Sequence, residues 1–307
     1  MAKKQNEHQP RFTRQLTLSE FDALFPNEEA CRTFLLLRRW PAGPRCPRCN
    51  NDHVYESTAR PWHWQCMKCG PKPRSPYRFA LTTGTIFEES KKPLLMWFKV
   101  LHLMVTSKKG ISALQIHRML GTGSYQTAWY MCMRLRAGMK DPDFRQLMGI
   151  VEVDETWIGG KEGNKHLGKR GKWATQGKTP VIGAIARKGN VVCQMIERTD
   201  TDALTGFVRQ VTKARATLVI TDEAKGYDAI TIYDREHQFV RHSAGEYVRG
   251  NIHTQSIESF WSLLKRGVIG TYHHVSKKYL PLYLAEFQFR FNNRNEQDIF
   301  GKAIGGC

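Results

Sequence analysis

Three acidic residues in the second half of the chain have the types and spacing that metal-dependent phosphodiester chemistry needs. Asp154 lies in a run of alternating apolar and polar residues, and Asp222 directly follows the apolar run 218–221. Glu258 comes after a gap of 35 residues, in a segment with helical periodicity. Close carboxylates repel one another, and Mg²⁺ removes that conflict because it prefers hard oxygen ligands. The acids therefore predict a site for two Mg²⁺ or Mn²⁺ ions, which can activate an attacking water or 3′-hydroxyl and stabilise the leaving oxygen.

The helical segment 254–266 places Lys265 beside Glu258. The two residues are seven positions apart, about two helical turns, so both side chains project from one face. A lysine at this place can hold a phosphate of a DNA end as a point charge. A second face of the helix is apolar and would pack it on a sheet, which brings Glu258 near the strand ends. The apolar face consists of Ile257, Phe260, Trp261 and Leu264.

Each acid also has a simpler interpretation. Asp222 could be a turn residue, and Glu258 could be an exposed helix acid that pairs with a neighbouring charge. Asp154 has two competitors, Glu152 on the same face of the strand and Glu155 next to it. The strand positions, the gap and the lysine offset together favour Asp154, Asp222 and Glu258 as the ligands.

Two further residues are assigned supporting positions behind the ligands. Gln255 lies one helical turn before Glu258 on the same side, so either residue could supply the third ligand. Glu258 is preferred because the offset of Lys265 counts from it, and Gln255 then becomes a supporting residue. Glu152 is the second supporting residue.

These side chains need a sheet and helices to bring them together. Three strands, then a helix, then a strand and later helices are the order of a ribonuclease-H-like α/β domain, in which helices flank a mixed sheet. That order predicts a fold class and does not by itself fix a function. The predicted strands are 149–158, 180–186, 190–197, 217–221 and 237–241, and the predicted helices are 202–213, 254–266 and 278–291.

A separate set of residues near the beginning of the chain predicts a structural zinc site. Two Cys-x-x-Cys pairs, separated by 16 residues, can supply the four thiolates that zinc prefers in a tetrahedron. A redox pair would not need to occur twice at this distance. Cys31 is a nearby competitor in a helical pattern, and Trp62, Trp64 and Tyr55 are expected to pack the small hairpin. The four ligands of the single Zn²⁺ are Cys46, Cys49, Cys66 and Cys69.

The segment after the zinc module predicts a helix-turn-helix that binds DNA. Ser112 can cap a first helix, the glycines at 121 and 123 fit a short turn, and Ser124 can cap a second helix. A plain helical hairpin that packs the linker is the alternative. If the second helix enters a DNA groove, its contacts are Gln126, Thr127, Arg134 and Arg136, with Tyr130 nearby.

The net charge favours a nucleic acid partner. The chain has 47 Lys+Arg against 28 Asp+Glu, a formal net charge of +19, and such a surplus is typical of proteins with a polyanionic partner. A glycine-rich loop between the first two predicted strands of the sheet would border the acids and could clamp DNA phosphates. The alternative is a solvated loop. Its basic residues are Lys161, Lys165, Lys169, Arg170, Lys172 and Lys178.

Membrane insertion is not expected. No apolar stretch reaches the ~18 residues that span a bilayer, and the first residues are polar, unlike a secretory signal. We expect a cytoplasmic protein without a membrane partner, associated with the nucleoid when it is bound to DNA. The expected domains are a flexible tail at 1–14, a helical lead-in and zinc ribbon at 15–90, a helix-turn-helix-like segment at 91–145 and a catalytic domain at 146–307.

Longer motifs surround these residues. Besides the two cysteine pairs they are 153–160 (VDETWIGG), 221–224 (TDEA), 253–265 (HTQSIESFWSLLK), 270–275 (GTYHHV) and 289–294 (FRFNNR). Together they resemble the DDE transposases of bacterial insertion sequences, in particular the ISXO-like group, over roughly residues 15–300. The resemblance implies a cut-and-paste or replicative transposase that acts on terminal inverted repeats with Mg²⁺. It also implies a homo-oligomer that holds two transposon ends and target DNA.

Two other functions fit parts of the pattern. A ribonuclease-H-like nuclease or resolvase would cut DNA without strand transfer and would need no upstream zinc ribbon. A non-catalytic DNA-binding regulator would have no use for clustered acids, so the intact acids argue against it. The sequence therefore predicts a DNA transposase.

Overall fold

The computed structural model describes residues 16–70, 75–140, 146–160, 177–212, 216–223, 227, 236–241 and 248–306. The chain divides into two compact units, and each is described by itself. Unit 1 contains Met1–Met139 and Asn293–Cys307, and unit 2 contains Lys140–Asn292. The predicted tail at 1–14 lies outside the described residues. Within those residues, no helix is both long enough and apolar enough to cross a membrane.

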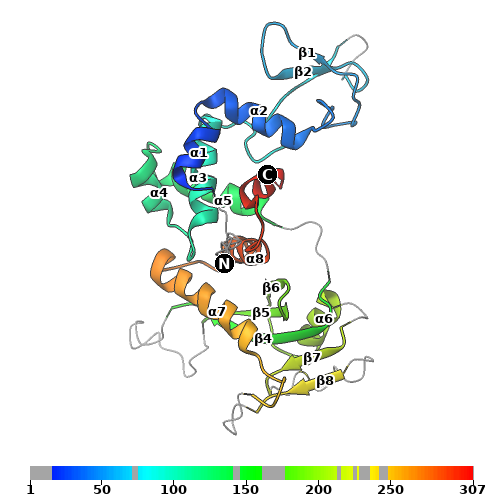
Figure 1. Ribbon diagram of the computed structural model, residues 1–307, viewed down its shortest axis with the longest axis vertical. Helices are drawn as coiled ribbons and strands as arrows, with labels where there is room; N and C mark the ends of the chain where they lie inside the picture. The colour runs from blue at the N-terminus through cyan, green and yellow to red at the C-terminus, as the bar shows by residue number, and fades with distance from the viewer. Residues whose placement is uncertain are drawn as a thin grey trace, which may run out of the picture. The chain divides into compact units, whose positions relative to one another are not determined.

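Unit 1 combines helices with a small antiparallel sheet. Phe300, near the end of the chain, packs in its aromatic core, with ring centroids 5.4 Å from both Phe25 and Phe98. The end of the chain, Asn293–Cys307, therefore belongs to unit 1. The catalytic domain expected from the sequence, 146–307, included these residues. The helices are α1 (Leu18–Leu24), α2 (Glu28–Arg39), α3 (Leu94–Thr106), α4 (Ala113–Leu120), α5 (Tyr125–Gly138) and α9 (Ile299–Gly305), and the sheet has the order β1 (Tyr55–Glu56), β2 (His63–Cys66), β3 (Tyr77–Ala80) (Figure 1).

Unit 2 is built on a five-stranded mixed sheet of order β6-β5-β4-β7-β8. β5 runs antiparallel to β4 and β6, whereas β7 runs parallel to β4 and β8. Counted along the chain within the unit, the order is 3-2-1-4-5, which is that of the ribonuclease-H-like fold and confirms the predicted fold class. The strands are β4 (Ile150–Ile158), β5 (Thr179–Ala186), β6 (Val191–Met195), β7 (Leu218–Thr221) and β8 (Glu236–Phe239), and the helices are α6 (Thr201–Val211), α7 (Gln255–Gly267), a π-helix (Val268–Tyr272) and α8 (Leu280–Asn292).

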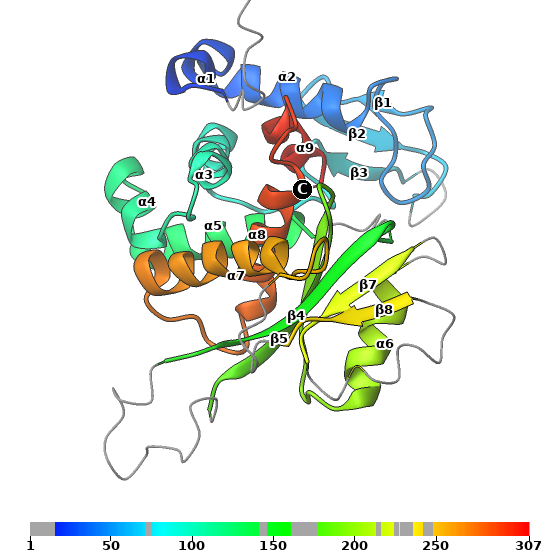
Figure 2. The same cartoon turned by 60° about the horizontal axis from the view of Figure 1, so that its bottom comes forward.

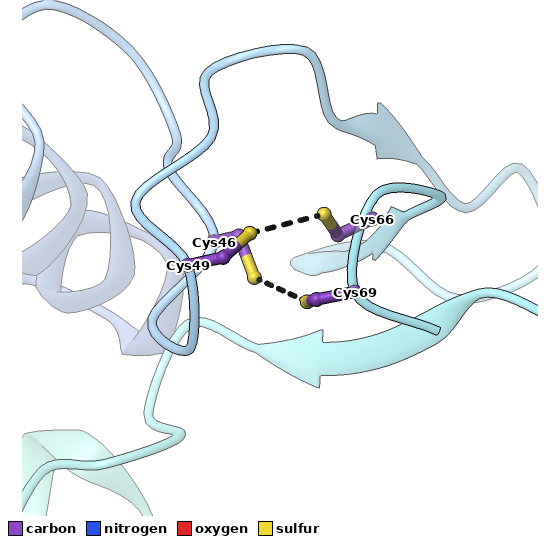
Figure 3. A group of neighbouring side chains, drawn as sticks. All are labelled: Cys46, Cys49, Cys66 and Cys69. Carbon is purple, nitrogen blue, oxygen red and sulfur yellow. Dashed lines mark hydrogen bonds between the residues drawn. The ribbon is translucent and has the colours of Figure 1, made fainter. Parts of the chain in front are cut away.

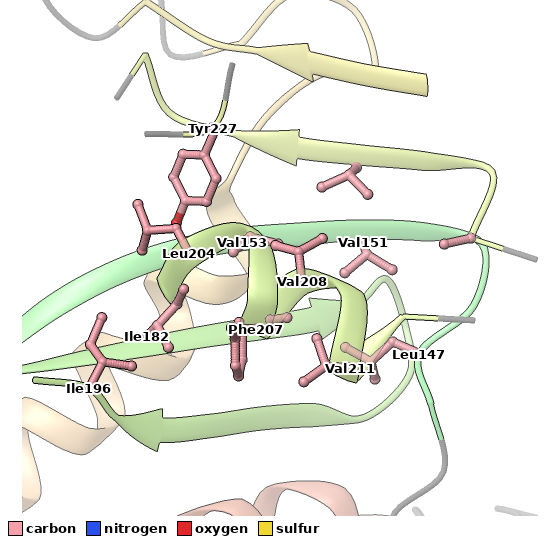
Figure 4. Close-up of a cluster of buried hydrophobic side chains, with 13 residues drawn as sticks. Leu147, Val151, Val153, Ile182, Ile196, Leu204, Phe207, Val208, Val211 and Tyr227 are labelled. Atoms are coloured by element: carbon pink, nitrogen blue, oxygen red, sulfur yellow. The ribbon is translucent and has the colours of Figure 1, made fainter. Parts of the chain in front are cut away.

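The central strand β4 serves both faces of the sheet because successive side chains of a strand point to opposite sides. Val151 and Val153 are fully buried against Phe207 and its neighbours on α6 (Figure 4). Glu152 and Asp154 alternate with these valines, so they point to the other face, which α7 covers (Figure 2). One strand thus supplies core residues to one face and acids to the other.

The apolar stripe predicted for α7 packs on this second face. Its residues are at most 3% exposed and share a core cluster with side chains of β4, β5 and β6. Burial of this stripe fixes which side of α7 remains accessible, and Glu258 and Lys265 lie on the exposed side. The stripe consists of Ile257, Phe260, Trp261 and Leu264.

Candidate active site and metal centres

The two predicted aspartates lie just beyond the paired part of two neighbouring parallel strands. The pairing of β4 with β7 ends at Glu152 and Ile220, and Asp154 and Asp222 each follow two residues later. Side-chain oxygens of Asp154, Glu155 and Asp222 all lie within 4.8 Å of one another. The structure therefore brings two of the predicted ligands together, and it adds Glu155, which the sequence offers only as a competitor of Asp154.

Two of these acids are disfavoured in their charged forms. Burial raises the pKa of Asp154 to about 7, and the negative charge of Asp222 adds to the effect. Burial likewise raises the pKa of Glu155 to about 7, with further contributions from the charges of Asp222 and Asp154. A divalent cation among the three would favour their ionised forms, and a set of carboxylate oxygens suits Mg²⁺ or Mn²⁺.

Charges on α7 also act on Asp154, although less strongly than burial and Asp222. Glu258 raises the pKa of Asp154, and Lys265 lowers it. Thr254 Oγ1 donates a hydrogen bond of 2.6 Å to Glu258 Oε1, which orients that carboxylate. The helical residues are thus close enough to influence the cluster from its accessible side. Gln255 lies exposed at the start of the same helix.

Glu155 has a partner that the sequence does not indicate. The hydroxyl of Tyr227 donates a hydrogen bond to Glu155 Oε1, which opposes the rise in the pKa of Glu155. The ring of Tyr227 is fully buried at one end of the core cluster between α6 and the sheet (Figure 4). Because 72 positions separate the two residues, no local pattern around residue 227 could reveal the contact.

Glu152 does not compete with Asp154 for a place in the cluster. It is fully buried, and its carboxylate accepts hydrogen bonds from the N–H groups of Ser256 and Ile257, in the first turn of α7. Glu152 is therefore bonded to the start of α7 and is not one of the clustered acids, and its supporting role stays a prediction.

The close packing of α7 depends on a glycine opposite Asp154. Gly183 is the β5 partner of Asp154, and a Cβ at this position would lie 2.6 Å from two ring atoms of Trp261 and 3.2 Å from Ile257. We expect Gly183→Ala to push α7 away from the acids and to destabilise the fold by about 1–3 kcal/mol. Because Glu258 moves with the helix, the DNA cleavage that the resemblance to DDE transposases implies should fall at least about tenfold, which corresponds to about 1.4 kcal/mol of barrier.

Gly206→Ala provides a matched control. Gly206 lies within α6, where an added Cβ meets nothing within 4 Å. Alanine should stabilise that helix by about 1 kcal/mol and leave cleavage unchanged. Urea unfolding and an end-cleavage assay on both variants check this pair. Cleavage at the wild-type rate by Gly183→Ala would contradict the dependence on close packing.

The four predicted zinc ligands come together in unit 1. Cys46 Sγ lies 3.4 Å from Cys69 Sγ, and Cys49 Sγ lies 3.7 Å from Cys66 Sγ (Figure 3). A tetrahedral zinc ion with bonds of about 2.3 Å holds its thiolates about 3.8 Å apart, so the cluster fits one structural Zn²⁺. Cys31 is a buried cysteine of α2 and is not part of the cluster.

The small sheet packs its rings differently from the expectation. Trp64 is buried, with its ring centroid 5.4 Å from Trp40 and 6.0 Å from Phe79. Tyr55 is 65% exposed and Trp62 is partly exposed, so the prediction that these two fill the hairpin is wrong. Trp40 comes from the end of α2, and this longer-range partner replaces them.

The helix-turn-helix segment has the caps that the sequence predicts. Ser112 Oγ accepts a hydrogen bond from the N–H of Gln115, and Ser124 Oγ accepts one from the N–H of Thr127, each at 3.1 Å. Gly121 ends α4 with a φ of 59°, a left-handed conformation that favours glycine. These features define the two helices and their turn, and DNA reading by the second helix stays a prediction.

One predicted DNA contact on α5 is buried. Arg136 is only 2% exposed, because it lies on the packed side of the helix, so we withdraw it as a contact. Gln126 is exposed, and Arg134 is partly exposed and donates hydrogen bonds to Glu88 O (3.2 Å) and to Tyr130 Oη (3.3 Å). A groove along this side of α5 is lined by Gln126, Thr127, Tyr130, Arg134, Lys91 and Lys92, among others.

Most of the predicted basic loop lies outside the described residues. Lys178 lies just before β5, against Gly159 at the end of β4. The remaining residues stay a prediction about the strand-to-strand connection beside the acids. They are Lys161, Lys165, Lys169, Arg170 and Lys172.

Comparisons with known proteins agree with the zinc site and with the acidic domain. Residues 146–292 match the family of the ISXO2-like transposase domain, and residues 26–72 match the transposase zinc-ribbon domain. A protein in transposable element ISH50 of Halobacterium salinarum is 28% identical over 280 residues, which cover 87% of this chain and 91% of that protein. A transposase-like protein of Haemophilus influenzae is 26% identical over 106 residues, 34% of this chain and 84% of that protein.

Two solved structures align weakly with the chain. One is the simian T-cell lymphotropic virus intasome in complex with PP2A regulatory subunit B56 gamma, with a TM-score of 0.29 and 12% identity over 57% of this chain. The alignment covers 63% of that viral complex chain, less than two thirds of its length. The Mos1 strand transfer complex aligns with a TM-score of 0.30 and 11% identity, over 71% of this chain and 76% of that chain. Both TM-scores are low, so the fold class rests on the strand order and the family match.

A zinc ribbon joined to a ribonuclease-H-like domain with clustered acids at its strand ends defines a protein of the transposase class. Within that class, residues 146–292 match the ISXO2-like transposase domain and residues 26–72 match the transposase zinc-ribbon domain. The chain is also similar over most of its length to a protein of an insertion element.

Proposed function

We propose that this protein binds the terminal inverted repeats of an insertion sequence, cleaves the DNA at the element's ends and joins those ends to target DNA. The observation that carries the proposal is the acidic cluster, in which oxygens of Asp154, Glu155 and Asp222 lie within 4.8 Å of one another. It lies in the matched transposase domain, and the charges of Glu258 and Lys265 act on it.

Each member of the site has a proposed task. Bound Mg²⁺ or Mn²⁺ ions would activate an attacking water or 3′-hydroxyl and stabilise the leaving oxygen of the phosphodiester. Asp154 and Asp222 would hold the ions from the strand ends, and Glu258 would supply the third carboxylate from α7. Lys265 lies exposed two turns further along the same helix, where it would bind a phosphate of the DNA end.

Glu155 is a further proposed ligand that the sequence argument did not select. One of its carboxylate oxygens lies within 4.8 Å of side-chain oxygens of Asp154 and Asp222. The hydrogen bond from Tyr227 fixes the orientation of the Glu155 carboxylate. It would either bind an ion directly or accept a hydrogen bond from a bound water. In both roles it adds negative charge beside Asp154 and strengthens cation binding.

DNA binding is proposed for both units. The net charge of +19 supports a polyanionic partner. In unit 1, the exposed side of α5 with Gln126, Thr127 and Arg134 is the proposed DNA surface, together with the zinc ribbon. In unit 2, the basic residues between β4 and β5 would clamp phosphates. Joining two transposon ends to one target further predicts a homo-oligomer on paired ends.

A strand-transfer assay tests the proposal. The full chain is incubated with labelled duplexes carrying the inverted repeats that flank its gene, a target plasmid, and Mg²⁺ or Mn²⁺. We expect cleaved ends and joined product, both dependent on the divalent ion. Cleavage without joined product would instead indicate a nuclease or resolvase, and binding without cleavage would indicate a regulator.

A further inference from the structure

We propose that Glu152 is a positioning residue that sets the place of Glu258 relative to Asp154 by capping the first turn of α7 from the middle of β4. The inference rests on the proposed function, because it assigns a role within the same acidic site. The two acids come from elements that are more than 100 positions apart in the chain, so some contact between those elements must fix their spacing.

The carboxylate of Glu152 is the point where β4 and α7 meet. Its Oε2 accepts hydrogen bonds from the N–H groups of Ser256 (2.8 Å) and Ile257 (3.2 Å). Its Oε1 accepts hydrogen bonds from Ser256 Oγ (3.0 Å) and from Arg187 Nε (2.8 Å). His253 Nδ1 lies 3.5 Å from the same oxygen. A fully buried carboxylate is thus surrounded by donors, most of which belong to the start of α7.

α7 depends on this carboxylate because it lacks a side-chain cap of its own. Thr254 stands at the N-cap position and makes no capping hydrogen bond. The N–H groups in the first turn of a helix need an acceptor, which is usually the side chain at that position. Glu152 supplies the acceptor instead. The hydroxyl of Thr254 is therefore available to Glu258, to which it donates at 2.6 Å.

Arg187 holds the same segment from a second strand. It lies just after β5, and while its Nε bonds to Glu152, another of its nitrogens donates to the carbonyl of His253 (3.1 Å). The start of α7 is therefore tied to β4 and to the end of β5. Held in this way, the first turn cannot slide along the sheet without breaking charge-assisted hydrogen bonds.

We call the hydrogen bonds between Glu152 and the first turn of α7 the clamp. On β4 and on α7 alike, the residues of the clamp are close in sequence to the acids. On β4, Glu152 and Asp154 are two residues apart on one face, about 7 Å along the strand. On α7, Ser256 and Glu258 are also two residues apart. A bond between Glu152 and Ser256 therefore fixes the separation of the two acids more directly than contacts elsewhere on α7.

Glu152→Gln tests the proposal because it keeps the shape and changes the hydrogen bonding. The amide nitrogen of glutamine would face donors that need an acceptor, so the first turn should shift. The probe is Mn²⁺ added to the zinc-loaded full chain, with bound Mn²⁺ measured by electron paramagnetic resonance. We expect Mn²⁺ affinity to fall about 10–100-fold, as when partners behind metal ligands are removed, and the Mg²⁺ concentration for half-maximal cleavage to rise.

Glu286→Gln is the matched control. Glu286 is an equally buried carboxylate of unit 2, on α8; it accepts a hydrogen bond from Tyr272 Oη (3.2 Å) and forms an ion pair with Arg290 (3.3 Å). Its replacement should lower the urea midpoint but leave Mn²⁺ affinity unchanged. Equal losses of Mn²⁺ affinity in the two variants, or an unchanged affinity in Glu152→Gln, would overturn the positioning role.

Two further variants keep the test decisive if Glu152→Gln fails to fold. Ser256→Ala removes only one of the hydrogen bonds to Glu152 and should weaken Mn²⁺ binding a few-fold, and unchanged binding would count against the proposal. In Glu258→Gln, the added Ser256→Ala change should cause no further loss, because the clamp acts through Glu258. Mn²⁺ binding needs neither DNA nor turnover. A wild-type chain that bound no Mn²⁺ would therefore refute the proposed function, whereas loss only in the variants supports the clamp.

Discussion

Asp154→Asn and Asp222→Asn are each expected to lower DNA cleavage and strand transfer about 10³-fold or more, which corresponds to about 4 kcal/mol of barrier. Asparagine fills the same space, but it offers a single neutral oxygen where the site needs an ionised carboxylate. Because the oxygens of these acids lie within 4.8 Å of one another, either change removes a ligand from the proposed cation site. Binding of DNA ends measured in Ca²⁺ should remain intact.

The same substitution at residue 154 should stabilise the metal-free fold at high pH. Burial, followed by the charge of Asp222, raises the pKa of Asp154 from 3.8 to about 7. Between these values the folded state binds more protons than the unfolded state, so the contribution of Asp154 to stability falls as the pH rises. We therefore expect Asp154→Asn to unfold at a higher urea concentration than the wild type at pH 8 without Mg²⁺, and at a similar concentration at pH 4.

Asp202→Asn is the control for both measurements. Asp202 is an exposed acid in the first turn of α6 and is not one of the clustered acids, so its loss should leave cleavage unchanged. Added Mg²⁺ should raise the urea midpoint of the wild type and of Asp202→Asn more than that of Asp154→Asn. Cleavage near the wild-type rate in either cluster variant would remove that aspartate from the site. An Asp154→Asn chain less stable than the wild type at pH 8 would contradict the pKa argument.

The parts of the site that the sequence could predict depend on local patterns. Asp222 follows a four-residue apolar strand, and Asp154 alternates with valines that are now seen buried against α6. The stripe that packs α7 has helical spacing, so it indicates which side of the helix carries Glu258. In each case the periodicity of one segment determines which way its side chains point, and no knowledge of a distant partner is needed.

The parts that could not be predicted depend on pairs of residues far apart in the chain. Tyr227 reaches Glu155 across 72 positions, and Glu152 reaches Ser256 across 104. Phe300 joins the aromatic core of unit 1 although the chain passes through all of unit 2 first. Arg136 shows a different limit, since α5 is packed on much of its circumference and its arginine at the helix end is buried. Local periodicity cannot show how many sides of a helix are covered.

Removal of zinc is the second change with a large expected effect, and it should unfold only the cysteine-bearing sheet. We expect Cys49→Ser or Cys66→Ser to abolish zinc binding and to unfold β1, β2 and β3, because that sheet buries few rings of its own. Zinc supplies about 10–16 kcal/mol to the folding of comparable metal-dependent peptides, far more than one small aromatic cluster. Hydrogen exchange followed by mass spectrometry should show protection lost in residues 46–80 and retained in β4 and β5.

Buried cysteines outside the cluster provide the controls. Cys31→Ala and Cys193→Ala remove thiols from α2 and β6, and both variants should keep one zinc ion per chain and the exchange protection of the small sheet. Protection that persists in Cys49→Ser without bound zinc would contradict the metal requirement.

The zinc-free variant also separates the two proposed DNA surfaces of unit 1, because it removes the zinc ribbon and leaves α5 folded. If the ribbon contributes to end binding, Cys49→Ser should bind the inverted repeat more weakly, with a smaller dependence of affinity on salt, since each lost phosphate contact lowers that slope by about one. If its affinity and salt dependence equal those of Cys31→Ala, the ribbon has no part in end recognition. Since the basic residues between β4 and β5 are unchanged in both proteins, the comparison isolates what the zinc-held sheet adds.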